Sequence, residues 1–543
     1  MTTQEEDRVS RKLRKLLADK RWFRGKARKV DNIELLDHIP FSAREEDGAI
    51  VLARITYEDL GSETYALYLL ESRKGRTVTL SECVSEPISE QALRALLNRG
   101  AVLHGALGDV SAAATPAAQR DLAPSADPLA VRLLVAEQSN TSLVFGDQYL
   151  LKLYRRVEPG VQPDLEVSRF LTSHGFLNAP ELAGNIVYRK PSGEEITLGM
   201  LQHFVKNQGD GWQLALGALK AAFVRATASS SPVPRIPSKA TLLELARSEP
   251  PDGGLELLGD HARWIKLLGR RTGELHLVLA SDPSDPAFAP EPFTERARMD
   301  LRESIESLCI QAMSLIRDRE PKLRGPSREA LRRVLSLEAA IRSRFEDLLL
   351  GEFASSRIRC HGDYHLGQVL IANSDIVITD FEGEVTRPIT ERRAKHSPLR
   401  DVAGMLRSFH YASRAATADF KAAEVRRLEP WAKLWRTSAS ALFLGSYLEV
   451  VRAAPFFPGS DAETQRLLDA YLLEKTLYEV AYEFNHRPTW AAIPVEGLLE
   501  LVGDSPQGRI PRPLQLHDCL QAVVSTPAED PHSGKGATGA GPL

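Results

Sequence analysis

The chain has 543 residues, of which 43% are hydrophobic and 26% are charged, as in ordinary globular proteins. Its net charge of −3 gives no general attraction to nucleic acid or to anionic membranes. The N-terminus lacks the apolar core of a signal peptide, and no apolar run is long enough to span a bilayer. The four cysteines lie far apart without a C-x-x-C pair, so neither a zinc site nor a disulfide framework is indicated. We therefore expect a cytoplasmic enzyme.

Residues 1–110 are predicted to form a small α+β unit. A charged helix is expected at residues 9–17, and strand-like apolar patterns follow at residues 33–39, 49–57 and 65–71. This unit carries no catalytic constellation of its own. Residues 111–128, rich in alanine and proline, have the composition of an exposed linker.

Residues 129–206 change to a strand, turn and strand pattern. Lys152 lies mid-strand among apolar residues, where an unpaired ammonium is costly to bury. It either pairs with an anion or extends to solvent from an edge strand. Protein kinases pair such a lysine with a helical glutamate, and Glu166 in a helix-like segment is the predicted partner.

Two further parts of this region are predicted to bind nucleotide. A polar turn replaces the glycine-rich loop of protein kinases and is expected to contact phosphate oxygens. Its residues are Ser139, Asn140, Thr141 and Ser142. The strand at residues 198–205 is expected to run into a hinge that reads adenine through its backbone, and we place Gln202, Phe204 and Val205 there.

The most informative stretch runs from His361 to Gly383, within the mostly helical residues 207–502. Protein kinases carry H-R-D-x-x-x-x-N followed by D-F-G, where this chain has H-G-D-x-x-x-x-Q and then D-F-E-G. The spacing predicts phosphoryl transfer, with Asp363 as the base that orients and deprotonates an alcohol. Gln368 and Asp380 supply oxygen ligands of the kind that Mg²⁺ prefers. ATP and Mg²⁺ are the expected cofactors.

Residues 391–409, directly after this stretch, closely resemble bacterial maltokinases, which are aminoglycoside-phosphotransferase-like sugar kinases. The R-W-F-x-G-K pattern at residues 21–26 and the N-x-G-D-x-W pattern at residues 207–212 are similar to the same family. The resemblance implies an α+β, bilobal protein-kinase-like fold with an N-terminal cap. It also implies phosphorylation of maltose at its anomeric hydroxyl, which feeds glycogen synthesis from trehalose, and it admits a complex with trehalose synthase. Asp401 resembles the aspartate that braces kinase catalytic loops.

The acceptor site is expected on the later helices, at residues 431–451 and 467–484. Glu474, Tyr478 and Tyr482 recur every four residues and therefore share one helical face. Such a face is either core or a sugar-binding surface, and the spacing alone does not decide between them. The resemblance implies a set of sugar contacts made by His365, Glu474, Lys475, Tyr478 and Tyr482.

Two other functions stay open at this point. The ATP machinery does not encode the acceptor, so a related kinase for another sugar, such as glucosamine, fits the same motifs. A non-catalytic partner of trehalose synthase is the second, although all the catalytic positions are filled. The protein is expected to be a monomer or a homodimer, and residues 503–543 are expected to form a largely disordered tail.

Overall fold

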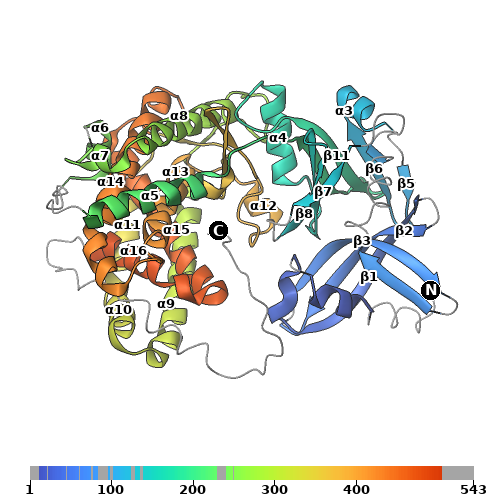
Figure 1. The fold of residues 1–543 in the computed structure, drawn as a ribbon, viewed down its shortest axis with the longest axis horizontal. Helices are drawn as coiled ribbons and strands as arrows, with labels where there is room; N and C mark the ends of the chain where they lie inside the picture. The colour runs from blue at the N-terminus through green and yellow to red at the C-terminus, as the bar shows by residue number, and fades with distance from the viewer. Residues whose placement is uncertain are drawn as a thin grey trace. The chain divides into compact units, whose positions relative to one another are not determined.

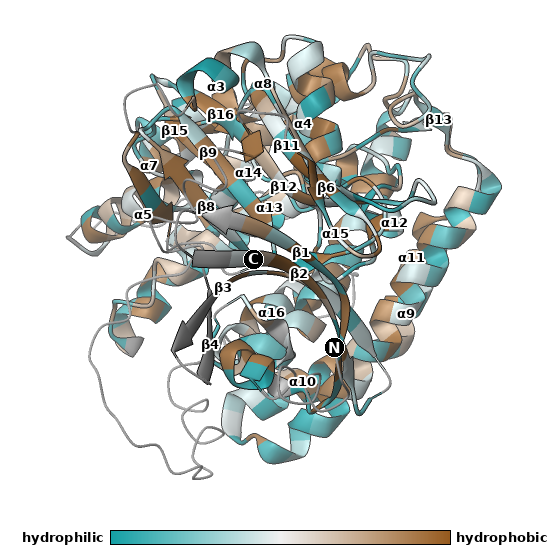
Figure 2. Cartoon of the chain, turned by 90° about the vertical axis from the view of Figure 1, so that its right-hand side faces the viewer, coloured by the Kyte–Doolittle hydropathy of each residue, from teal (hydrophilic) through white to brown (hydrophobic). Residues whose placement is uncertain are grey.

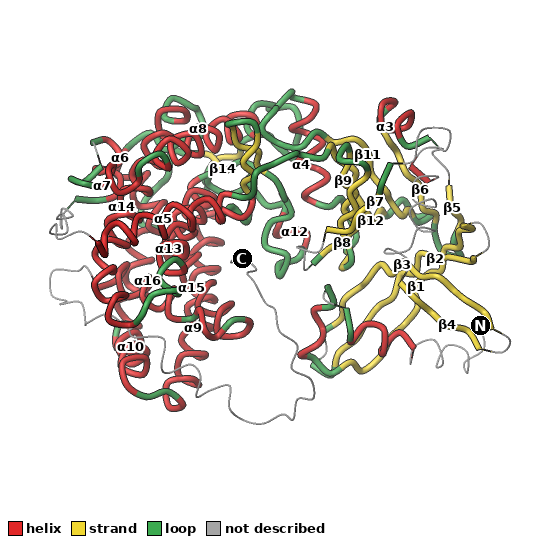
Figure 3. The backbone as a smooth tube through the Cα atoms, in the orientation of Figure 1, coloured by secondary structure: helices red, strands yellow, loops and turns green. Residues whose placement is uncertain are grey.

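The computed structural model describes residues 12–20, 22–43, 46–59, 61–74, 77–82, 96–97, 102–123, 129–134, 139–228, 240–248 and 250–503. The chain forms two compact units (Figure 1). Unit 1 is built from Met1–Lys206 and Thr379–Arg393, and unit 2 from Asn207–Ile378 and Ala394–Leu543. The chain therefore crosses between the units three times. Strands dominate the described part of unit 1, and helices dominate that of unit 2 (Figure 3).

The N-terminal part of unit 1 is an antiparallel sheet. Its order is β1 (Val30–Ala43), β2 (Glu46–Tyr57), β3 (Ser62–Lys74) and β10 (Arg156–Val157), with β4 (Thr77–Glu82) also paired to β3. The three predicted strands are present and are longer than predicted. The predicted N-terminal helix is seen at residues 12–18, and its earlier residues lie outside the described part.

Both faces of this cap sheet are buried, because apolar residues occupy successive positions that point to opposite sides. Ile50 and Leu52 of β2 enter one hydrophobic core, together with residues of the second sheet of unit 1. Val51 and Ala53 enter the other core, together with Trp22 of the predicted R-W-F-x-G-K pattern. The cap is thus packed into unit 1 as part of its core.

The second sheet of unit 1 has seven strands in the order β5-β6-β11-β12-β9-β8-β7. Their bounds are β5 Val102–His104, β6 Asp109–Ala114, β7 Val131–Leu134, β8 Asn140–Phe145, β9 Tyr149–Tyr154, β11 Leu182–Arg189 and β12 Glu195–His203. Lys152 pairs in register with Ser142 of β8 and with Met200 of β12. It therefore lies on an interior strand, which excludes the edge-strand alternative.

The predicted linker at residues 111–128 is wrong in its described part. Residues 111–114 belong to β6, which pairs with β5 and β11, and α3 (Pro116–Asp121) follows. Thr115 caps α3 by accepting a hydrogen bond from the Ala118 N–H. Ala112 and Ala118 are buried, because small side chains allow close packing of the backbone. The alanine-rich composition is therefore that of a packed strand and helix and not of a linker.

Unit 2 is mainly helical, and α9 and α11 carry both polar and apolar residues, as expected of amphipathic helices (Figure 2). Its longer helices are α5 Gly211–Ala228, α8 His261–Leu279, α9 Glu295–Arg319, α10 Gly325–Ser336, α11 Glu338–Leu348, α13 Leu399–Ala415, α14 Ala422–Val451, α15 Asp461–His486 and α16 Ala492–Gly503. A hairpin of β15 (Val369–Ala372) and β16 (Asp375–Ile378) turns through Asn373 and Ser374, both with positive φ. The predicted disordered tail lies outside the described residues from 504 onward. The helices that the structure describes include none long and apolar enough to cross a membrane.

Helix α14 packs along α8, and two glycines of α8 permit the close approach. A Cβ atom added at Gly273 would lie 2.7 Å from the Cβ of Val450, and one at Gly269 would meet the backbone oxygen of Phe443. Any larger side chain would therefore force the two helices apart. This close packing places side chains of α8 and α14 in contact with one another near Tyr364.

His261 at the start of α8 makes unit 2 sensitive to acid. Its ring stacks on Trp435, and neither ring nitrogen has a hydrogen-bond partner in the described part of the chain. Burial lowers the pKa of His261 to about 4. The unfolded chain binds a proton here below pH about 6.5, whereas the folded chain binds it only near pH 4, so stability is lost as the pH falls through this window.

We expect His261→Phe to reduce this acid destabilisation by up to about 3 kcal/mol between pH 6.5 and pH 4, because Phe keeps the stacking contact and cannot take a proton. Urea unfolding across this pH range measures it. The control is His104→Gln, which removes an exposed histidine that pairs with Asp109. An unchanged slope in His261→Phe would contradict the assignment.

Candidate active site

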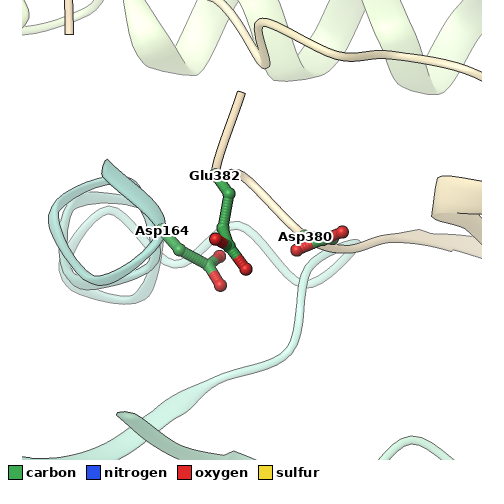
Figure 4. Close-up of side chains that lie close together, drawn as sticks. All are labelled: Asp164, Asp380 and Glu382. Atoms are coloured by element: carbon green, nitrogen blue, oxygen red, sulfur yellow. The ribbon is translucent and has the colours of Figure 1, made fainter. Parts of the chain in front are cut away.

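In unit 1, the predicted phosphate-holding lysine is buried among carboxylates. The ammonium of Lys152 lies 2.9 Å from Asp164 and 2.6 Å from Glu382, and it also pairs with Asp380. Asp164 lies on α4 (Pro163–Ser173), and the other two acids follow β16 in the chain (Figure 4). Oxygen atoms of the three carboxylates lie within 4.8 Å of one another. They form the acidic cluster of unit 1.

Burial and charge act in opposite directions on this cluster. Burial alone would lower the pKa of Lys152, but the three carboxylates outweigh it and hold the pKa well above its ordinary value. Burial raises the pKa of Glu382 to about 7, with Asp380 and Asp164 adding to the rise and Lys152 opposing it. The charged lysine and its carboxylates therefore stabilise one another in a desolvated environment.

The backbone of the acidic cluster is held in an uncommon conformation. Asp380 has a φ of 69°, in the left-handed region that residues other than glycine seldom adopt. The next N–H, of Phe381, donates to Asp164 at 2.9 Å. Glu382 accepts hydrogen bonds from the side-chain amides of Asn140 and, at 3.4 Å, Gln162. Strained backbone of this kind clusters at functional sites.

The predicted pairing of Lys152 with Glu166 is corrected by the structure, which gives Lys152 another helical partner, Asp164. Glu166 instead accepts two hydrogen bonds from the guanidinium of Arg393, at 2.5 and 3.0 Å. Side chains two positions apart in a helix are separated by about 200° around the helix axis and lie on nearly opposite faces. Only one of these two acids can therefore face β9. Asp164 is the one that does, and it is almost fully buried.

The polar turn predicted to hold phosphate is only partly a turn. Strand β8 already begins at Asn140, and Asn140, Thr141 and Ser142 are all buried. Thr141 accepts a hydrogen bond from Arg155 at 2.7 Å, and Asn140 donates to Glu382. The side chains of Asn140 and Thr141 thus bind groups of unit 1 itself. Ser139, just before β8, is half-buried and stays a predicted phosphate contact.

The predicted hinge follows β12. Gln202 lies in β12 opposite Leu150. The N–H of His203 donates to Glu181, and that of Phe204 donates to Gln148 at 2.8 Å. These two backbone donors are therefore already used within unit 1. The roles of Gln202, Phe204 and Val205 in nucleotide binding stay predictions.

In unit 2, the predicted catalytic loop, residues 361–366, is held by Asp401 of α13. One carboxylate oxygen of Asp401 accepts the N–H of His361 at 2.7 Å, and the other accepts that of Gly362 at 3.0 Å. Gly362 has a φ of 88°, which favours glycine. Burial raises the pKa of Asp401, but the hydrogen bond and electrostatic attraction of His276, together with His361 and the N–H of Gly362, outweigh burial and lower the pKa. It is therefore an ionised brace for the backbone next to Asp363.

The carboxylate of Asp363 is half-buried and forms an ion pair with Lys475 of α15, with Nζ 3.1 Å from Oδ1. The same ammonium lies 4.9 Å from the centre of the Tyr478 ring. Tyr478 and Tyr482 follow on this face of α15, half-buried, with ring centres 6.1 Å apart. Lys475, Tyr478 and Tyr482 therefore form a partly exposed surface that begins at the predicted base.

Of the other predicted site residues of unit 2, Glu474 and His365 are buried and Gln368 is half-buried. Glu474 is buried, with Arg400 at 3.8 Å and Ser304 at 3.4 Å. His365 is buried, and its Nδ1 accepts the N–H of Gly367 at 3.1 Å, which shapes the turn before β15. Gln368 is half-buried in that turn. The structure thus gives Glu474 and His365 internal partners, and their contact with a sugar stays a prediction.

Two residues of the acidic cluster, Asp164 and Glu382, were missed by reasoning from the sequence. Glu382 is the third residue of D-F-E-G, two positions after Asp380, and this proximity was an available signal. Asp164 carried no such signal, because Glu166 fits the kinase pattern equally well. The missed residues are both carboxylates, and carboxylate oxygens are the ligands that Mg²⁺ prefers. The donor set of the cluster therefore fits a magnesium ion.

A glucosamine kinase of Streptacidiphilus jiangxiensis is 24% identical over 382 residues, which cover 68% of this chain and 73% of that protein. A glucosamine kinase of Mycolicibacterium smegmatis is 25% identical over 381 residues, covering 69% and 80%. A solved glucosamine kinase in complex with glucosamine, ADP and inorganic phosphate has a TM-score of 0.54 at 19% identity, covering 90% of this chain and 98% of that one. No protein-family model matches.

The chain has the fold of the solved glucosamine kinases. The predicted fold class, α+β and bilobal protein-kinase-like with an N-terminal cap, is confirmed. A second solved glucosamine kinase structure agrees, with a TM-score of 0.57 over 90% of the chain. The prediction about partners is wrong. The relatives are named for glucosamine and not for maltose, and nothing supports a complex with trehalose synthase or the link to glycogen synthesis.

Proposed function

We propose that this protein is an ATP-dependent sugar kinase whose acceptor is glucosamine. The observation that carries the proposal is the braced loop of unit 2, in which Asp401 fixes the backbone and leaves the Asp363 carboxylate partly exposed beside α15. The lysine and acidic cluster of unit 1 supply the groups that a nucleotide requires. The relatives named glucosamine kinases support the choice of acceptor.

In the proposed reaction, Asp363 orients the acceptor hydroxyl and takes its proton as the hydroxyl oxygen attacks the γ-phosphorus of ATP. The bond from the γ-phosphorus to the bridging oxygen breaks, and ADP leaves. Lys152 binds phosphate oxygens of the nucleotide. Asp380 and Glu382 are the residues that would hold Mg²⁺, with Gln368 as the predicted additional donor. When bound, the ion neutralises charge on the phosphates.

A neutral sugar is the second candidate acceptor, and one contact favours it. The ammonium of Lys475 lies 3.1 Å from the Asp363 carboxylate, and a protonated amino group on the acceptor would be repelled if it approached that ammonium. Glucosamine binding then requires its amino group to point away from Lys475. A neutral acceptor carries no such restriction.

The test is ATP-dependent phosphorylation measured on glucosamine, N-acetylglucosamine, glucose and galactosamine, with the phosphate position read by ³¹P NMR. Glucosamine should give the highest kcat/KM. Preference for glucose over glucosamine would move the assignment to the neutral-sugar candidate. ADP release with none of these sugars, while ATP and Mg²⁺ still bind, would refute the proposed acceptor class.

A further inference from the structure

Behind the catalytic loop of unit 2 lies a second layer of polar groups, contributed by α8 and α14. Thr272 and His276 of α8 are four residues apart and therefore lie on one face of the helix. Both are completely buried. Thr272 shares a hydrogen bond of 2.9 Å with the hydroxyl of Tyr364, and His276 lies 3.1 Å from Asp401. One face of α8 therefore touches the catalytic loop directly and also its brace.

We propose that His276 is a positioning residue for the catalytic loop, acting through Asp401, and that Tyr447 of α14 sets its tautomer. The proposal rests on the proposed function in that it takes Asp363 as the catalytic base. His276 itself touches neither the acceptor nor Asp363 in the contacts described. Its effect on the reaction passes through the two N–H groups that Asp401 accepts.

The ionised state of Asp401 determines which atom donates and which accepts in each of these hydrogen bonds. An ionised carboxylate only accepts, so Nε2 of His276 must carry the proton that it donates to Asp401. In the neutral imidazole Nδ1 is then an acceptor, and the hydroxyl of Tyr447, 3.0 Å away, donates to it. Tyr447 therefore favours the one neutral tautomer that can hold Asp401.

The surroundings leave these groups little freedom. His276, Asp401 and Tyr447 are each at most 2% exposed. The glycines of α8 allow α14 to approach closely enough for Tyr447 to reach the imidazole. Without His276, the Asp401 oxygen that accepts the His361 N–H loses the imidazole donor, so the carboxylate is held less firmly. Asp363 is two residues further along the loop, so a small rotation displaces the base from its attacking hydroxyl.

The experiment compares His276→Phe, His276→Gln, Tyr447→Phe and the double variant of His276→Phe with Tyr447→Phe, all in the full chain. We expect kcat to fall by about tenfold to a hundredfold in His276→Phe, as is usual for loss of a group that orients a ligand or base. KM for ATP should change by less than about twofold, because the nucleotide groups are untouched. His276→Gln should recover part of kcat, since its amide N–H can donate.

Tyr447→Phe should lower kcat by about threefold, and the double variant should be no slower than His276→Phe alone, because Tyr447 acts only through His276. The control is Val334→Ala in α10, a fully buried residue outside the catalytic loop, whose truncation destabilises the core of unit 2 without removing a polar contact. Independent, multiplicative losses in the double variant would overturn the proposal. So would a loss of kcat in His276→Phe no larger than that of Val334→Ala.

Hydrogen exchange of the peptide that spans residues 358–366 gives a readout that needs no substrate. The N–H groups of His361 and Gly362 should exchange faster in the His276 and Tyr447 variants than in Val334→Ala. If the wild type phosphorylates no sugar, the proposed function fails while this measurement still decides the positioning role. If His276→Phe does not fold, His276→Gln combined with Tyr447→Phe provides the same test, and wild-type exchange in both single variants would refute it.

Discussion

Replacement of Asp363 by asparagine is expected to lower kcat by about 10²- to 10⁴-fold, the range that a positioned general base contributes. The amide cannot accept the proton of the acceptor hydroxyl, and it no longer forms an ion pair with Lys475. Nucleotide binding should persist, because Lys152 and the acidic cluster of unit 1 are unchanged. Coupled detection of ADP gives kcat, and fluorescence titration with a labelled ATP analogue gives the binding constant.

The matched control for this substitution is Asp419→Asn. Asp419 is an exposed aspartate of unit 2 that pairs with Lys220, so it presents the same chemical change at a distance from the loop. It should leave kcat within about twofold, since exposed ion pairs contribute little. An Asp363→Asn enzyme that retained more than about a tenth of wild-type kcat would remove Asp363 from the role of base.

Lys152→Met is expected to destabilise the protein as well as inactivate it. The substitution leaves Asp164 and Glu382, both buried, without the cation that pairs with them. Breaking a buried ion pair by removing one partner costs about 3–5 kcal/mol. Thermal unfolding in the absence of divalent ions should show a clear fall in Tm, and ATP turnover should be lost because no ammonium remains to bind phosphate.

The same variant tests whether the acidic cluster fits magnesium. Without the lysine, the three carboxylates are free to share a divalent cation, so Mg²⁺ should raise the Tm of Lys152→Met more than that of the wild type. The control is Lys190→Met, which removes the exposed lysine that pairs with Glu194 in unit 1. Equal responses to Mg²⁺ in Lys152→Met, Lys190→Met and the wild type would show that the cluster does not hold the ion.

The parts of the site that were predictable from the sequence are those whose members are near neighbours in the chain. Asp363, Gln368 and Asp380 were found because a loop and a two-stranded hairpin fix their spacing within eighteen positions. Lys152 was found because a charged residue within an apolar strand requires an anion. In each case the physical requirement, a fixed spacing or a buried charge, can be recognised in a short stretch of sequence.

The parts that were missed depend on groups far apart in sequence. Whether Asp164 or Glu166 faces Lys152 depends on how α4 is rotated against β9, which no local pattern encodes. Asn140 and Thr141 stay predicted phosphate contacts, but the local pattern did not indicate that their side chains bind Glu382 and Arg155. The linker was misread because the alanine-rich strand β6 pairs with β11, about seventy positions later. The sugar was misassigned because the motifs of phosphoryl transfer describe the donor and leave the acceptor open.

The three crossings of the chain between the units have a consequence for recombination. The segment Thr379–Arg393 returns to unit 1 and carries Asp380 and Glu382 with it. A polypeptide that ended at residue 206 would retain Lys152 and Asp164 but would lack two of the three carboxylates that bind the lysine. A single genetic exchange at that boundary would therefore combine a lysine from one parent with acids from the other. Chimaeras of this protein with a relative should keep activity only when residues 379–393 are exchanged together with the first 206.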